Sequence, residues 1–589
     1  MVGNSGQEWV KIRNRSDAAV EGLGVEGYLI KTVTDGKVGR KVVLVFGADP
    51  HGTNYGVLDL AARISAAGEL AALEDLNLRE KPRYALRGIY AHQHWTYNRP
   101  YALRSWTLKD WQRYIDILAS LRVNLLQLWS MVGIIPDPAN PSDWEYLSRY
   151  EEIIRYAKDE RGMQQVWPGE CVNNIATSTH GMPIEKREYF VVEELRNPAD
   201  PKGFQQIMDN RRNLYKATPS ADGYWILDSD PGKWVGSPAS DFRKIFQGNR
   251  ELIDQYNKNP ERAKLVYWML FGWGTDWPNE YKIDEQAIRA SVRELQQHLK
   301  GPLWATAHNE LHLKIAADND LIPHTVYFPY GTIEHEPSAP LTKIRFDVAR
   351  ERYRELARYP EIGGMMGNSQ TPLLQLPNIY FFSQLGWDPD RAKTPDREVI
   401  RELALKMYPE AVEDLADGWY QLSRQDSEAC RSAAARLEQR VQTKRLGRAG
   451  IVGQYFFPDG FLLLGDLATS LRMHGAAIDA VKLLQGGEDK TTEISEALQV
   501  YLLQALILQQ RSGYHIAPMR DGTDWLSSRP WFIDGPDYDS IRSARKAYAS
   551  RHPDPLKPVV DRVKKALQAS DYDAKIYGRM IDFLLQRSL

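Results

Sequence analysis

The feature that most constrains the fold is a regular alternation of short apolar runs with amphipathic helical segments between Tyr84 and about Asp388. Eight runs have the length and composition of buried strands. They are Leu86–Ala91, Asn124–Trp129, Gln164–Trp167, Gly223–Leu227, Lys264–Phe271, Pro302–Ala307, Thr325–Tyr330 and Gly363–Gly367. Helical periodicity fills the intervals, as at Leu108–Leu121, Trp144–Glu160, Asp241–Asn257, Asp284–Leu299 and Ile344–Ala357. Eight consecutive βα units predict a closed (β/α)8 barrel, with an open doubly wound sheet as the structural alternative.

Two segments of different character flank these units. Before them, Gly27–Thr34 and Lys41–Phe46 have strand patterns and Val57–Leu73 has helical spacing. After about Arg391 the strand signals stop, and helices are predicted at Asp396–Met407, Glu410–Leu422, Asp426–Gln442, Phe461–Leu484, Thr492–Arg511, Pro555–Leu567 and Asp571–Leu585. We therefore predict an α/β protein with a small α/β accessory domain (1–80), a TIM barrel (81–390) and an α-helical C-terminal domain (391–589). The Trp-, Pro- and Gly-rich segment Ser512–Tyr538 is a candidate loop at the barrel mouth.

Charge and hydropathy exclude several classes of partner. The net charge is −2 and no basic block stands out, which argues against nucleic acid. No apolar run is long enough to span a bilayer, so we expect no membrane partner, and the sequence gives no signal of oligomeric state. Cys171 and Cys430 cannot build a disulfide framework. The N-terminus lacks a signal-type apolar core, which predicts a cytoplasmic protein, or a secreted or periplasmic one if a leader was removed.

The aromatic content and the strand ends point to carbohydrate. The chain has 17 Trp and 30 Tyr, whose flat faces and polar edges suit stacking on sugar rings. In a barrel of this kind the functional groups come after the strands, at their carboxyl ends. The fourth run, GYWILDSDP, ends abruptly in Asp228 and Asp230. Buried carboxylates are costly unless partners or chemistry account for them, although Asp-x-Asp-Pro is also good turn chemistry.

Carboxylates after several strands predict glycoside cleavage, in which one acid protonates the leaving oxygen and a second acts as nucleophile or base. The catalytic candidates are Asp228, Asp230, Glu310 and Glu170; for Glu310, helix capping by Asn309 is the competing explanation of the local polarity. The predicted substrate-binding residues are His92, His94, Trp95, Trp167, Trp273, Asp276, His308, Tyr330, Glu334, Glu336 and Asn368.

The pair His92 and His94 allows a different interpretation. An HxH pair after the first strand is a metal signature in amidohydrolase barrels. That arrangement also needs a histidine after strand five, which is lacking, and an aspartate after strand eight, where Asn368 stands. We therefore predict no metal and no cofactor.

The N-terminal segments EGYLIKTV and GADPHGTNYGVLDLAARI resemble the accessory domain that precedes the barrel in α-glucuronidases and β-N-acetylhexosaminidases. LRGIYAHQHW followed by WQRYIDILASLRVNLLQLW is similar to their first βα unit, and the resemblance covers residues 20–390. Hexosaminidases carry an Asp-Glu pair after strand four; here Asp228-Ser-Asp230 stands there, so only the position and one carboxylate carry over. The α-glucuronidase pattern implies Asp228 or Asp230 together with Glu310.

These observations predict an exo-acting glycoside hydrolase that cleaves an oligo- or polysaccharide by carboxylate catalysis. The alternatives are a metal-dependent, amidohydrolase-like hydrolase and a carbohydrate-binding barrel without catalysis.

Overall fold

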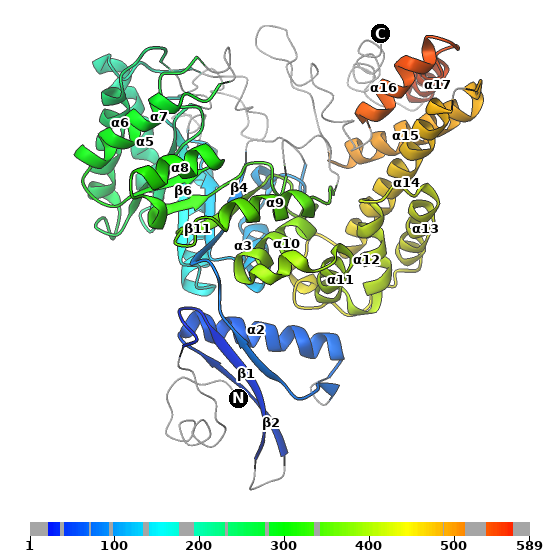
Figure 1. Ribbon diagram of the computed structural model, residues 1–589, viewed down its shortest axis with the longest axis horizontal. Coiled ribbons are helices and arrows are strands. Elements are labelled where there is room, and N and C mark those ends of the chain that lie inside the picture. The colour runs from blue at the N-terminus through cyan, green and yellow to red at the C-terminus, as the bar shows by residue number, and fades with distance from the viewer. Residues whose placement is uncertain are drawn as a thin grey trace.

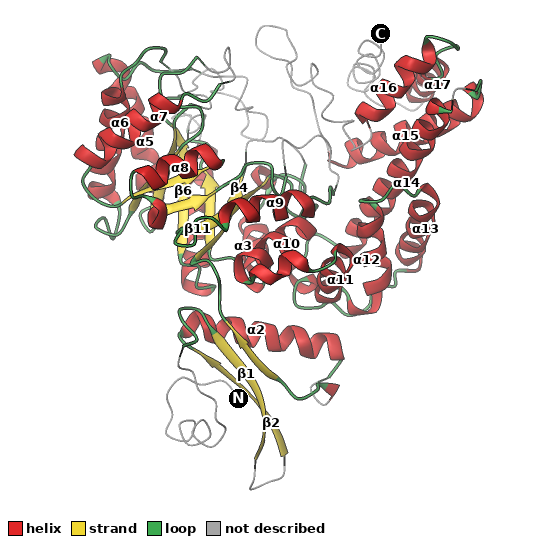
Figure 2. Cartoon of the chain, in the orientation of Figure 1, coloured by secondary structure: helices red, strands yellow, loops and turns green. Residues whose placement is uncertain are grey.

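The computed structural model describes residues 22–35, 40–69, 72–93, 98–132, 141–175, 194–229, 234–276, 282–334, 342–486, 488–512 and 538–568. Strands gather in two places, a barrel and a small separate sheet, and helices make up the rest of the ordered elements (Figures 1 and 2). The candidate loop Ser512–Tyr538 and the helix predicted at Asp571–Leu585 lie almost entirely outside the described residues.

The predicted barrel is confirmed. Neighbouring strands pair in parallel and the sheet closes in the order β10-β11-β4-β5-β6-β7-β8-β9. The strands are β4 (Leu86–Ala91), β5 (Leu125–Trp129), β6 (Gln165–Cys171), β7 (Gly223–Leu227), β8 (Lys264–Trp268), β9 (Leu303–Ala307), β10 (Thr325–Tyr327) and β11 (Gly364–Ser369). The strands β8 and β10 end before the predicted Phe271 and Tyr330, because the apolar run continues past the last paired residue into the loop.

Large aromatic side chains fill the barrel. Tyr90 lies with its ring centroid 5.0 Å from that of Trp268, 6.1 Å from Trp225 and 5.4 Å from Phe328. Gly169 makes this packing possible, because a Cβ there would come within 2.4 Å of the Trp225 ring. The interior is therefore a packed core rather than a pore, and any substrate must bind above it, at the carboxyl ends of the strands.

Helices surround the barrel (Figure 2). They are α3 (Leu108–Ser120), α4 (Pro141–Arg155), α5 (Pro201–Ala217), α6 (Ala239–Tyr256), α7 (Glu285–His298), α8 (Glu310–Asp318), α9 (Phe346–Leu356) and α10 (Leu376–Trp387). Helix α5 lies between the third and fourth barrel strands, in a segment where no helix was predicted. Its signals are local: Asp200 caps it by accepting from Gly203 N, Pro201 opens it, and Ile207 and Leu214 are buried.

The N-terminal elements form a small sheet with one helix. Strands β1 (Tyr28–Asp35), β2 (Arg40–Gly47) and β3 (Asn77–Glu80) pair antiparallel in the order β2-β1-β3, and α2 (Pro50–Ala67) packs on β1 and β2. The strand β3 was not predicted, because its four residues carry no run of apolar side chains. Figure 1 shows this unit below the barrel in the view, with α2 on its upper side.

A buried ion pair joins this unit to the amino ends of the barrel strands. Glu26 Oε2 lies 2.6 Å from Arg87 Nη2, and both side chains are almost completely buried. Gln164 Nε2 donates to Glu26 Oε1 at 2.7 Å. The guanidinium carbons of Arg87 and Arg122 lie 5.2 and 4.4 Å from the centre of the Trp387 ring. The accessory unit is thus fixed at the end of the barrel away from the candidate site.

The C-terminal part is helical, as predicted. Its helices are α11 (Asp396–Met407), α12 (Val412–Gln421), α13 (Ser427–Thr443), α14 (Gly460–Gln485), α15 (Thr491–Ser512), α16 (Tyr538–Ala549) and α17 (Leu556–Gln568). Within the described residues, no helix is both long and apolar enough to cross a bilayer. The predicted boundaries at residues 80 and 390 stay predictions.

A buried carboxylate ties these helices to a loop at the barrel mouth. Asp466 of α14 is 2% exposed. Its Oδ2 accepts from the hydroxyl of Tyr101 at 2.6 Å, and its Oδ1 lies 2.8 Å from Arg511 Nη1 of α15. Tyr101 belongs to the β4–α3 loop and packs in one apolar cluster with side chains of α14 and α15. The helical part therefore supports one side of the mouth.

We predict that Arg87→Met lowers the free energy of unfolding by about 3–5 kcal/mol, because it leaves the carboxylate of Glu26 buried without a counter-ion. Urea unfolding measures this change. The matched control is Arg401→Met, which removes the partner of Glu413 from a pair in which both side chains are more than half exposed, and should cost no more than about 1 kcal/mol. Equal effects of the two substitutions would contradict the role given to Glu26 and Arg87.

Candidate functional site

The carboxyl end of the barrel has an aromatic floor made by two stacked pairs. The His92 ring lies on Trp129, with centroids 4.8 Å apart and planes 9° apart. The His308 ring lies over Trp268 at 5.5 Å and 24°, and Trp268 Nε1 donates to His308 Nε2. Burial lowers the pKa of both His92 and His308 well below the ordinary value. Both imidazoles are therefore neutral near neutral pH and present hydrogen-bonding edges rather than charge.

A neutral polar network completes the floor. Gln370 Nε2 donates to the Tyr330 hydroxyl at 2.9 Å, and that hydroxyl lies 3.5 Å from His92 Nδ1. Asn368 Oδ1 accepts from Gly331 N at 2.9 Å, and its Nδ2 donates to the backbone oxygen of Glu334. The structure thus brings together four predicted substrate-binding residues, namely His92, His308, Tyr330 and Asn368.

Asp228 is buried and holds a loop. Its Oδ2 accepts from the Tyr267 hydroxyl at 2.9 Å, from Leu270 N at 3.2 Å and from Gly272 N at 3.1 Å, and its Oδ1 accepts from the Ser229 hydroxyl. Tyr267 faces the Phe242 ring of α6, so this carboxylate lies between the barrel wall and the helix layer. Asp228 therefore fastens the β8–α7 loop to the end of β7, and these hydrogen bonds occupy its carboxylate.

Glu334 fastens a second pair of loops in the same way. Its Oε2 accepts from Gln370 N at 2.7 Å and from Thr371 N at 2.8 Å, and its Oε1 accepts from the Thr371 hydroxyl at 2.5 Å. Burial raises the pKa of Glu334, while these donors oppose the rise. The carboxylate of Glu334 thus joins the loop after β10 to the loop after β11. From the sequence, Glu334 was predicted to contact substrate.

The other predicted carboxylates fall in different places. Glu310 begins α8 behind Asn309, whose side chain caps the helix, and forms an ion pair with Arg358 in which the side chains are 58% and 55% exposed. Glu170 is buried and accepts from Cys171 N at 2.9 Å. Neighbouring residues of a strand point to opposite faces of the sheet. A Cβ on Gly169 would point at Trp225, so the side chain of Glu170 points to the other face of β6. Asp276 is half-buried in the loop after β8.

Two predicted tryptophans lie away from the mouth. The Trp167 ring packs against Trp304 at 5.9 Å, and its Nε1 donates to Gln165 at the amino-terminal end of β6. The Trp273 ring stacks on Phe242 of α6 at 5.8 Å, behind the barrel wall. Both side chains serve as packing. Four further candidates, His94, Trp95, Asp230 and Glu336, lie outside the described residues.

The floor also contains residues that were not predicted as site residues. Trp129 and Trp268 are the last residues of β5 and β8, and Gln370 comes directly after β11. The prediction rested mainly on the residues after each strand, whereas an inward-facing aromatic in the final strand position already lies at the mouth. Among the described residues, no group of three or more His, Cys, Asp or Glu side chains is arranged to hold a metal ion.

Comparisons with known proteins identify the fold. No protein-family model matches the sequence, and no curated protein matches it. A GH138 enzyme targeting pectin rhamnogalacturonan II aligns over 90% of this chain and 74% of its own, with a TM-score of 0.52 and 12% identity. A GH115 4-O-methyl-α-glucuronidase with specificity for decorated arabinogalactans aligns over 90% and 73%, with a TM-score of 0.51 and 11% identity. The chain thus has the fold of these glycoside hydrolases, as the sequence resemblance predicted.

We predict that Asp228→Asn lowers the free energy of unfolding by about 1.5–3 kcal/mol near pH 4, because the amide nitrogen cannot accept the hydrogen bonds that one carboxyl oxygen accepts. Burial raises the pKa of Asp228 to about 6 although four donors oppose the rise. The folded protein therefore holds this proton more tightly than the unfolded chain does. The stability that Asp228 contributes decreases as the pH rises from about 4 to about 6.

Unfolding of wild type and variant, measured from about pH 4 to about pH 7, tests this expectation. This range covers the pKa of Asp228 in the unfolded chain and in the folded protein. The difference in unfolding free energy between wild type and variant should be largest near the acid end and narrow as the pH rises. Asp209→Asn on the exposed surface of α5 is the control, and its cost should be no more than about 1 kcal/mol. An Asp228→Asn variant as stable as wild type at pH 4 would contradict the structural role.

Proposed function

We propose that the protein is a glycoside hydrolase that binds a sugar of an oligo- or polysaccharide on the floor of the barrel mouth. The observation that carries this proposal is the floor itself. Trp129 and Trp268 are buried beneath the neutral rings of His92 and His308, and the half-buried rings of His308 and Tyr330 offer the aromatic surface for a sugar ring. The Tyr330 hydroxyl, which accepts from Gln370, is an uncharged group that can pair with a sugar hydroxyl, and Asn368 holds the backbone beneath it.

The catalytic carboxyl groups in this proposal come from the loops at the mouth. Asp230 is the first candidate, because it lies beyond β7 two residues after Asp228, whose anchored side chain fixes the chain at that point. Asp276 comes from the loop after β8, the strand that pairs with β7. One of the two would protonate the leaving oxygen, and the other would act as nucleophile or base. Glu170, from β6 on the other side of β7, remains a predicted third carboxylate.

Exo action suits the surroundings of the mouth. The helices α14 and α15 pack against Tyr101 and Ala102 of the β4–α3 loop and Leu374 of the β11–α10 loop. These contacts close one side of the mouth, which favours binding a chain end over the middle of a long polymer. We also propose that the accessory, barrel and helical parts form three domains, divided near residues 80 and 390.

We predict that Asp230→Asn and Asp276→Asn each reduce turnover about 10²- to 10⁴-fold while the free energy of unfolding is kept, because each removes a proton-transfer or nucleophilic group. Release of reducing sugar from a panel of oligosaccharides identifies a substrate, and aryl glycosides then separate the roles. The general-acid variant should keep more of its activity on an aryl glycoside with an acidic leaving group, which needs no protonation. Glu170→Gln in the same assays tests the third carboxylate.

Glu310→Gln serves as the control, because its exposed ion pair with Arg358 predicts unchanged turnover. Full activity of both aspartate variants would contradict the assignment of Asp230 and Asp276. Glycan binding without turnover across the whole panel would indicate a carbohydrate-binding barrel instead. Activity that a chelator abolishes and a divalent metal restores would indicate the metal-dependent alternative.

A further inference from the structure

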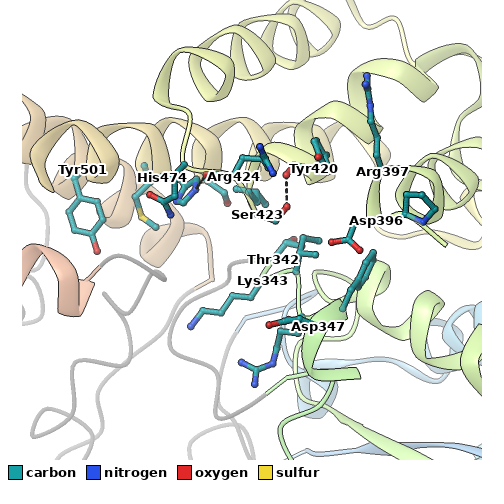
Figure 3. Close-up of a pocket in the computed structure, with 18 residues that line it drawn as sticks. Thr342, Lys343, Asp347, Asp396, Arg397, Tyr420, Ser423, Arg424, His474 and Tyr501 are labelled. Carbon is teal, nitrogen blue, oxygen red and sulfur yellow. Dashed lines mark hydrogen bonds between the residues drawn. The ribbon is translucent and has the colours of Figure 1, made fainter. Parts of the chain in front are cut away.

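A cavity of about 570 Å³ lies between the barrel rim and the C-terminal helices. On the barrel side it is lined by residues 342–347, the segment that leads into α9. On the other side it is lined by residues of α11, α12, α14 and α15 and of the loop between α12 and α13. Figure 3 shows Thr342, Lys343 and Asp347 facing Tyr420, Ser423 and Arg424 across this space.

The lining carries positive charge that is not neutralised. Arg345 and Arg424 form no ion pair within the part of the chain that the structure describes, and the Nε atom of Arg345 is buried without a hydrogen-bond partner. Burial lowers the pKa of Arg345, and the carboxylates of Asp347 and Glu334 oppose this effect only in part. Of the two carboxylates in the lining, Asp396 already lies 2.6 Å from Arg350, and Asp347 is exposed.

Groups that suit a sugar stand beside these cations. The ring of Tyr420 on α12 has the guanidinium carbon of Arg424 5.8 Å from its centre, and Ser423 and Ser470 bring hydroxyl groups to the lining. Ser423 donates to the backbone oxygen of Tyr420 at 2.7 Å, the contact drawn as a dashed line in Figure 3, and retains acceptor capacity. Guanidinium groups bind carboxylates with paired hydrogen bonds, and hydroxyl and aromatic groups bind the rest of a pyranose ring.

The cavity adjoins the mouth through one connection of the chain. The connection from β10 to α9 carries Tyr330 on the floor, is fastened at Glu334, and reaches the cavity at Thr342. Thr342 Oγ1 donates to the backbone oxygen of Leu374 at 2.8 Å, so this end of the connection is held by the β11–α10 loop, which also borders the mouth.

We infer that this cavity is a second saccharide subsite that binds a carboxylate-bearing sugar unit of the substrate through Arg345 and Arg424. The inference rests on the proposed function for the claim that the bound sugar belongs to the substrate. The subsite itself rests on the cavity and its unpaired guanidinium groups. The ligand class is therefore an acidic oligosaccharide, and a neutral chain of the same length should bind more weakly.

The test is isothermal titration of the full chain with oligogalacturonate and oligoguluronate, each compared with its carboxyl-reduced counterpart. Wild type should bind an acidic oligomer at least about tenfold more tightly than its neutral counterpart, and added salt should weaken that binding. Arg345→Met and Arg424→Met should each remove most of this preference. Arg345→Met leaves no buried partner unpaired, because its side-chain Nε has none. Arg401→Met on α11, outside the cavity, should bind as wild type does.

Turnover measured in parallel separates this inference from the proposed function. Loss of turnover in Asp230→Asn with acidic binding retained supports both. Acidic binding that depends on Arg345 in a chain without any glycosidase activity supports the subsite and overturns the proposed function. Turnover with equal affinity for acidic and reduced oligomers, or with binding that neither arginine variant changes, overturns the subsite and leaves the proposed function standing.

Discussion

Two buried carboxylates hold the rim of the barrel in place, and the candidate site depends on them. Asp228 joins the end of β7 to the loop after β8, and Glu334 joins the loop after β10 to the loop after β11. Each carboxylate accepts hydrogen bonds from backbone N–H groups that are buried at the rim and would otherwise be unpaired. Because a carboxylate offers several acceptor positions, one side chain can fix several residues of a neighbouring loop. The aromatic floor keeps its shape because the loops around it are fastened in this way.

This arrangement separates two tasks among the acids at the mouth. An acid whose two oxygens accept three or four donors cannot turn toward a substrate without leaving those donors unpaired. The anchored residues therefore fix geometry, and the proposed chemistry falls to acids on the loops that they anchor. Asp228 and Asp230 are two positions apart in the sequence: Asp228 anchors a loop, and Asp230 is proposed to carry the chemistry. The subsite inferred beside α9 is also bordered by a fastened loop, because Thr342 in its lining donates to the backbone oxygen of Leu374.

The sequence predicted the barrel well, because buried parallel strands are continuous apolar runs with regular spacing. It predicted the site only as far as the strand ends. The face of the sheet on which a residue lies there depends on where the strand pairing stops. Three of the four donors to Asp228 come from residues 39, 42 and 44 positions later. For Glu310, the capping explanation accounts for the local polarity, since Asn309 accepts from His312 N. Trp129 and Trp268 were not predicted, because an apolar run gives no sign of which of its members faces the mouth.

The contact between Tyr101 and Asp466 spans 365 positions of sequence. A ribosome makes the β4–α3 loop early and the helices α14 and α15 near the end, so the barrel strands can assemble before this loop has its final support. Tyr101 belongs to the first βα unit, yet its buried acceptor is made more than 300 residues later. Without α14 the hydroxyl of Tyr101 would lack its buried acceptor, Asp466. The length of this protein is thus part of how its mouth is built.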